Sequence, residues 1–137
     1  MGYKVHTVDG KSGEVSLAHV RSQTAQITIN TPAAGTHVMC RIPAAATVTA
    51  IRGYLVGGTS VTFNVTRRRS TTNVDLLAAD LVANTADAWT SSTTIQNGAL
   101  AAGDTLIADI AAQAGNPTQA VIEVDYTVHT PASTPPE

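Results

Sequence analysis

Apolar and polar residues alternate along several stretches of this chain, and this period of two limits the possible folds more than any other feature. Residues 60–66 alternate, which places Val61, Phe63 and Val65 on one face. Residues 120–128 repeat the pattern near the end of the chain. Successive side chains of a β-strand point to opposite faces of a sheet, so the pattern indicates strands with one buried and one exposed face.

Turn-forming residues separate the alternating stretches at short intervals, as at Gly57, Asn97 and Gly115. Short strands with frequent turns are typical of antiparallel sandwiches and barrels. We therefore expect an all-β fold, an antiparallel β-sandwich of jelly-roll-like type with about eight or nine strands. The expected strands cover residues 3–8, 15–20, 25–30, 37–42, 47–56, 60–68, 90–95, 105–111 and 119–129.

Residues 74–82 are ambiguous, because Val74, Leu77 and Leu81 have helical spacing and alanine and leucine favour helices. A strand or irregular structure fits the surrounding series of strands better. The core is expected to come from the apolar face of the strands. Its expected members are Ile27, Ile29, Ile51, Leu55, Val61, Phe63, Val65, Leu106, Ile110, Ile122, Val124 and Tyr126.

The two ends of the chain differ from its middle. Residues 1–25 carry only isolated apolar positions, which predicts an N-terminal arm or a peripheral hairpin. Residues 26–129 form the expected sandwich domain. Residues 130–137 contain three prolines, which cannot donate hydrogen bonds within a sheet, and we expect a flexible tail there.

Charged residues make up only 13% of the sequence, against a usual share of about 25%. A surface covered by threonine, serine, alanine and amides repels other proteins weakly and suits burial against them, which favours an oligomer or an assembly subunit. A neutral secreted or environmental domain is the alternative. The net charge of −2 predicts binding neither to nucleic acid nor to a membrane surface. Residues 1–6 have no apolar segment typical of a secretory signal, so we expect synthesis in a host cytoplasm.

The sequence contains no arrangement of residues that predicts catalysis or a cofactor. His6, His19, His37 and His129 are scattered singly, and zinc sites need clustered ligands. Cys40 has no cysteine partner, and strand parity with Val38 and Ile42 predicts that it points inward. Glu123 and Asp125 lie two residues apart, which is more typical of a solvated face or an ion pair than of a glycosidase. We expect no enzyme, no metal, no cofactor and no small-molecule substrate.

Two further motifs are weak. Asn64–Val65–Thr66 fits an N-glycosylation sequon, which we interpret as chance in a threonine-rich strand. The run Arg67, Arg68 and Arg69 lacks the wide basic patch that nucleic-acid binding needs. It fits a strand end whose guanidinium groups meet carboxylates of a neighbouring subunit, with Asp75 and Asp125 as possible partners, or a solvated edge.

The order of three segments resembles a known group of proteins. These segments are residues 42–65, which include TVTAIRGYLVGGTSVTFNV, residues 100–107 (LAAGDTLI) and residues 120–126 (AVIEVDY). Over about the last two-thirds of the chain, this order resembles small β-sandwich proteins of tailed-bacteriophage virions, with capsid decoration (cement) proteins closest in size. The resemblance includes no catalytic motif.

The resemblance implies a homo-oligomer, usually a trimer, that sits on the outer capsid surface and bridges major capsid proteins. The segment before Ala25 would then reach across a subunit boundary by adding a strand to a neighbour. The expected interface residues are Arg67, Arg68, Arg69, Lys4, Val5, Val15, Leu17 and Val20.

A tail-fibre or receptor-binding head that recognises a host surface ligand is the second hypothesis. Exposed aromatic residues would favour it, and Trp89 and Tyr54 are the only obvious candidates. A small hydrolase is the third hypothesis, and the lack of a nucleophile with a nearby base argues against it.

Overall fold

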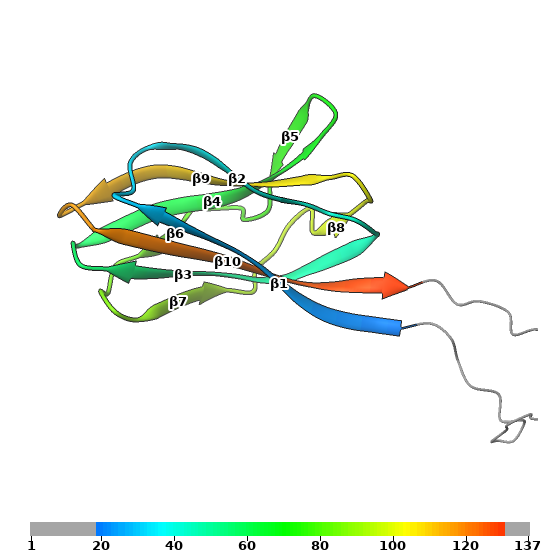
Figure 1. Cartoon of the computed structure of the whole chain (residues 1–137), viewed down its shortest axis with the longest axis horizontal. Coiled ribbons are helices and arrows are strands. Elements are labelled where there is room, and N and C mark those ends of the chain that lie inside the picture. The colour runs from blue at the N-terminus through cyan, green and yellow to red at the C-terminus, as the bar shows by residue number, and fades with distance from the viewer. Residues whose placement is uncertain (1–18, 131–137) are drawn as a thin grey trace, which may run out of the picture.

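The computed structural model describes residues 19–130, and these residues form ten strands and no helix (Figure 1). The strand bounds are β1 His19–Asn30, β2 Gly35–Arg41, β3 Ala46–Val56, β4 Ser60–Arg69, β5 Thr72–Asp75, β6 Leu81–Ala83, β7 Trp89–Ser92, β8 Ala99–Leu100, β9 Thr105–Ala114 and β10 Gln119–Thr130. Seven strands overlap the expected stretches, whereas the short strands β5, β6 and β8 were not expected, and the expected strand over residues 3–8 lies outside the described residues.

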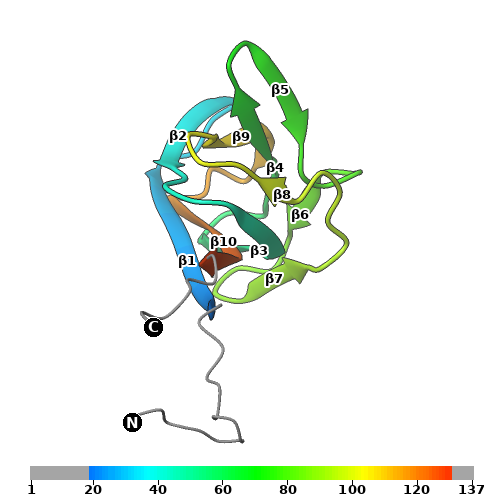
Figure 2. The same cartoon turned by 90° about the vertical axis from the view of Figure 1, so that its right-hand side faces the viewer.

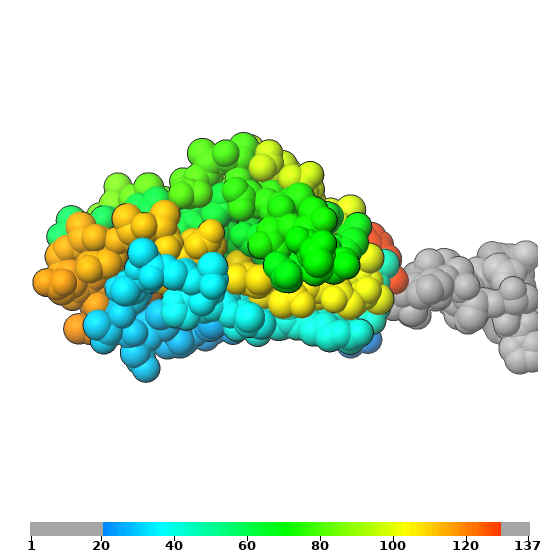
Figure 3. Space-filling model, turned by 90° about the horizontal axis from the view of Figure 1, so that it is seen from above, coloured from blue at the N-terminus to red at the C-terminus, as the bar shows by residue number. Residues whose placement is uncertain are grey.

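The strands pair into two antiparallel sheets that pack face to face, which confirms the expected β-sandwich (Figure 2). Sheet A has the order β1-β10-β3-β7, and β8 also pairs with β3. Sheet B has the order β2-β9-β4-β5, and β6 also pairs with β4. The β4–β5 hairpin projects from the body of the sandwich, and Figure 3 looks onto this side of the molecule, over β2, β9 and the hairpin.

The core fills the space between the sheets, as the alternation predicts. Of the twelve expected core residues, ten are buried, whereas Ile27 and Tyr126 are partly buried and pack against the core. Ile42, which shares the expected inward parity of Cys40, also belongs to the core, as do Leu76 and Leu77, which the alternating pattern does not identify. Leu76 and Leu77 lie in the segment that directly follows β5, which forms no regular strand or helix and places both side chains in the core.

Two expectations about secondary structure need correction. Residues 19–30 form the single strand β1 and not the ends of two strands over 15–20 and 25–30, because residues 19–24 continue the pairing with β10 from Asp125 to Thr130. The helical alternative for residues 74–82 is wrong, since this stretch holds the end of β5, an irregular segment and the start of β6.

The inward parity of Val38 is also wrong, because the pairing of β2 with β9 shifts by one residue between Val38 and Cys40. Such a bulge changes which side chains face the core. As a result, Val38 is 68% exposed, whereas Met39 and Cys40 both pack against the core.

Within residues 19–130, no helix is long and apolar enough to cross a membrane.

Candidate functional site

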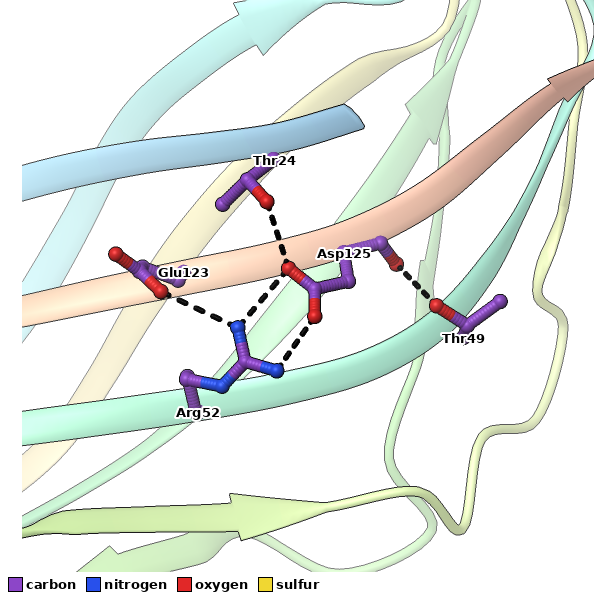
Figure 4. A network of polar contacts seen from close by, with 5 residues as sticks. All are labelled: Thr24, Thr49, Arg52, Glu123 and Asp125. Carbon is purple, nitrogen blue, oxygen red and sulfur yellow. Dashed lines mark hydrogen bonds and ion pairs between the residues drawn. The ribbon is translucent and has the colours of Figure 1, made fainter. Parts of the chain in front are cut away.

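The outer face of sheet A carries a cluster of charges around Arg52 of β3 (Figure 4). Its guanidinium donates to Asp125 at 2.9 Å and to Glu123 at 3.2 Å, both on β10, and a second nitrogen also contacts Asp125. Thr24 of β1 donates to Asp125 at 2.8 Å. The hydrogen bonds from Arg52 lower the pKa of Asp125, which favours the charged form of this carboxylate within the ion-pair network.

An aromatic pair lies beside this network. The rings of Tyr54 and Trp89 are 5.0 Å apart at their centroids and are inclined by 57°. Strand pairing places these residues opposite each other on β3 and β7, and Trp89 is 50% exposed. The two aromatic residues that the sequence singles out are therefore neighbours, although 34 intervening positions separate them along the chain.

The three arginines at the end of β4 have different surroundings. Arg69 forms a bidentate pair with Asp104, with both contacts at 2.8 Å. Arg68 is exposed and donates to Asn73 at 3.1 Å. Arg67 donates to the carbonyl of Ala99, while its Nε is buried without a hydrogen-bond partner among the described residues.

Asp104 is the most deeply buried carboxylate of the part that the structure describes. Its side chain is 2% exposed, and besides Arg69 it accepts a hydrogen bond from the backbone N–H of Ala101 at 2.8 Å. The hydrogen bonds from Arg69 lower its pKa against the opposing effect of burial. This pair ties the end of the β4–β5 hairpin to the turn before β9. Asp75 and Asp125, the expected partners, instead contact Thr66 and Arg52 of their own chain.

Arg41 and Arg68 lie close together on the outer face of sheet B. Strand pairing places Arg41 of β2 and Arg68 of β4 on either side of Thr105 of β9. Both arginines are exposed, and neither forms an ion pair among the described residues. Sequence reasoning missed Arg41, because only the strand register brings it near Arg68.

The remaining expected interface residues lie at the start of the chain. Lys4, Val5, Val15 and Leu17 lie outside the described residues. Val20 lies in β1, where it is paired with His129 of β10. The expected interface therefore stays a prediction.

Asn64 has a structural role that fits the interpretation of its sequon as chance. Its amide donates to the carbonyl of Leu77 and to Asp80, and its oxygen accepts from the backbone N–H of Leu77 and Val65. Because Asn64 is 4% exposed and its amide is engaged, a glycosylating enzyme could not reach it in the folded chain. The residue holds the irregular segment after β5 against β4.

Cys40 is partly buried, and burial raises the pKa of its thiol. Because the thiolate is the reactive form, we expect Cys40 of the folded chain to react with a disulfide reagent at pH 8 at least about ten-fold more slowly than in the unfolded chain. Ellman's reagent, added with and without urea, measures both rates on the same sample. Equal rates would show that the thiol is as accessible in the folded chain as in the unfolded one.

Over residues 19–130, the structure shows no group of three or more histidine, cysteine, aspartate or glutamate side chains placed to hold a metal ion. His129 contacts Thr47 at 3.2 Å, which links β10 to β3 at the end of sheet A.

Two solved structures share this arrangement of strands. A chain in the capsid of Ralstonia phage GP4 superposes with a TM-score of 0.57 and 16% identity, over 82% of this chain and 86% of that chain. A chain in the acidic stable capsid structure of Helicobacter pylori bacteriophage KHP30 superposes with a TM-score of 0.50 and 18% identity, over 83% and 98% of the two chains. The likeness is one of fold. No protein-family model and no curated protein matches the sequence.

Proposed function

We propose that this chain is a structural protein of a tailed-phage virion that binds the outer surface of the capsid as a decoration protein. As a homotrimer, it would bridge neighbouring major capsid proteins and stabilise the shell. The observation that carries this proposal is the shared fold with chains of two phage capsids, which spans more than four-fifths of this chain and of theirs. The low share of charged residues, 13%, independently supports a protein that is buried against others.

The edges of the two sheets offer a means of attachment. β1 is the outermost strand of sheet A, and over its twelve residues it pairs only with β10 within the described part of the chain. Its pairing has no bulge, and Arg21 is its one charged residue if histidine is counted as neutral. Long, regular edge strands readily accept another strand. We propose that residues 1–18 of a neighbouring copy, including Lys4, Val5, Val15 and Leu17, supply it.

Arg41 and Arg68 offer a second point of attachment on sheet B. Neither guanidinium group forms an ion pair among residues 19–130, which leaves both available to acidic side chains of another protein. Arg69 is less available, because Asp104 already occupies its guanidinium. We therefore place the arginine contact of the proposed interface at Arg41 and Arg68.

The first test measures assembly and capsid binding with the full chain. Light scattering after size exclusion should give three times the mass of one chain. When mixed with capsids of the encoding phage that were prepared without this protein, the chain should sediment with them and raise the temperature at which they rupture, since a ligand of the intact shell stabilises it. A monomer that stays in the supernatant would contradict the proposal.

A charge-matched pair of variants tests the arginine contact. Arg68→Ala and Asn84→Asp each make the net charge more negative by one, and Asn84 is exposed in the segment between β6 and β7. We expect Arg68→Ala to weaken capsid binding about ten-fold and Asn84→Asp to leave it unchanged, because charge-assisted hydrogen bonds contribute roughly 1.5–3 kcal/mol. Equal behaviour of the two variants would remove Arg68 from the interface.

A further inference from the structure

On the outer face of sheet A, one row of side chains crosses the strands β1, β10, β3 and β7. The strand register aligns Thr28 of β1, Val121 of β10, Tyr54 of β3 and Trp89 of β7. Each of these side chains is at least partly exposed, and Trp89 is half-exposed. Among the described residues, the exposed large apolar side chains are Val38, Val82 and Trp89, and Trp89 alone stands beside an aromatic ring, that of Tyr54.

The next row along the same face is polar. The register aligns Gln26, Glu123, Arg52 and Ser91 across the same four strands. On each strand, this row lies two residues from the row that contains the aromatic pair. Arg52 fixes the positions of Glu123 and Asp125 by hydrogen bonds, while each of these side chains remains partly exposed (Figure 4). The second oxygen of Glu123 and the Nε of Arg52 take no part in these bonds. Hydrogen-bond donors and acceptors whose positions are fixed by the Arg52 network therefore lie next to an exposed aromatic surface.

We propose that this face binds a neutral saccharide, a function that goes beyond the proposed capsid role. One face of a pyranose ring presents C–H groups, which pack on the electron-rich face of an aromatic ring such as Trp89. The hydroxyl groups at the rim of the sugar both donate and accept, as do the amide and hydroxyl side chains of Gln26, Thr28 and Ser91.

The composition of the face distinguishes a saccharide from a protein partner. The fully buried part of a protein interface is about 65% apolar and poor in charged residues. On this face, the apolar contribution comes from Tyr54, Trp89, Val121 and Val56, and hydroxyl, amide and charged side chains surround them. A small polyhydroxylated ligand matches this mixture better than a dry protein contact.

The charge of the face restricts the kind of sugar. Arg52 stands against two carboxylates, Glu123 and Asp125, which leaves this cluster with one net negative charge. A uronic or sialic acid would bring a further negative charge next to these groups and be repelled. We therefore expect binding of neutral hexose chains and rejection of acidic ones.

Trp89 is the only tryptophan of the chain, so its fluorescence reports directly on this face. An array of neutral and acidic bacterial surface glycans selects the probe, and the best neutral glycan is then titrated against the full chain in solution. We expect a saturable blue shift of the emission as the sugar excludes water from the ring. Absence of binding to every neutral glycan, or a preference for the acidic ones, would overturn the proposal.

Trp89→Ala and Val38→Ala form a matched pair, because both remove an exposed apolar side chain but from opposite sheets. On immobilised glycan, Trp89→Ala should bind about ten-fold or more weakly, and Val38→Ala should bind like the parent chain. Glu123→Gln, which keeps the shape of the side chain, should also weaken binding. If Trp89→Ala changes the oligomeric mass and leaves glycan binding intact, the face is a subunit contact and the saccharide proposal fails.

Discussion

Replacement of Phe63 by alanine should lower the free energy of unfolding by about 4 kcal/mol, the largest effect expected of a single substitution in this chain. Phe63 is the only phenylalanine and is 1% exposed. It extends from β4 of sheet B to β3 of sheet A, where a Cβ on Gly53 would lie only 2.6 Å from its ring. Truncation of a buried phenylalanine costs roughly 3–5 kcal/mol through lost transfer energy and the cavity left behind. Urea unfolding followed by circular dichroism measures the change.

Two further variants show whether the ring and Gly53 fit each other. Val82→Ala removes apolar atoms from an exposed position and should change the stability by less than about 0.5 kcal/mol. Gly53→Ala should cost about 1–3 kcal/mol by crowding the ring, and Phe63→Leu in the same chain should recover part of this loss. Additive effects of Gly53→Ala and Phe63→Leu would contradict direct packing. All measurements need the same protein concentration, because oligomers gain stability by mass action.

The alternation of the sequence predicts the sandwich well, because a period of two identifies a half-buried strand without knowledge of its neighbours. It fails where the period breaks. β3 buries both Ala50 and Ile51, and the pairing of β3 with β10 shifts at Asp125 and Tyr126, so the buried face changes parity along one strand. A bulge depends on how two strands distant in sequence align, and a local pattern does not contain that information.

The same reason limits the prediction of the polar contacts. The arginine run suggests ion pairs, but the acid that Arg69 meets is 35 positions away, in a turn that no charge pattern marks. Arg52 and its partners on β10 are 71 and 73 positions apart. The residue types indicate which side chains can form ion pairs. Strand order and register decide which partners they find.

Removal of Arg69 should destabilise the chain more than removal of its partner Asp104. The Arg69 side chain is 47% exposed, whereas that of Asp104 is 2% exposed. Arg69→Ala therefore leaves a buried carboxylate without its bidentate partner, and we expect a larger loss of stability at pH 7 than removal of Asp104 causes. Asp104→Asn keeps the shape and leaves an arginine that water can solvate, and we expect about 1–2 kcal/mol. The double variant should cost less than the sum of the two, as a double-mutant cycle would show.

The effect of Arg69→Ala should also depend on pH. Arg69 lowers the pKa of Asp104 in the folded chain, so the ion pair contributes its full stability above the unfolded pKa of about 3.9. This contribution is lost as the pH falls through the folded pKa, because Asp104 then becomes protonated. The gap between the parent chain and Arg69→Ala should therefore narrow between pH 5 and pH 3 and stay constant from pH 5 to pH 7.

The Arg52 network provides the internal control for this measurement. Asp125 also has a lowered pKa, because of its hydrogen bonds from Arg52, and it is unchanged in Arg69→Ala. Both proteins should lose the Asp125 contribution in acid alike, so it cancels in the difference between them. A gap that stays constant down to pH 3 would show that Arg69 does not set the ionisation of Asp104.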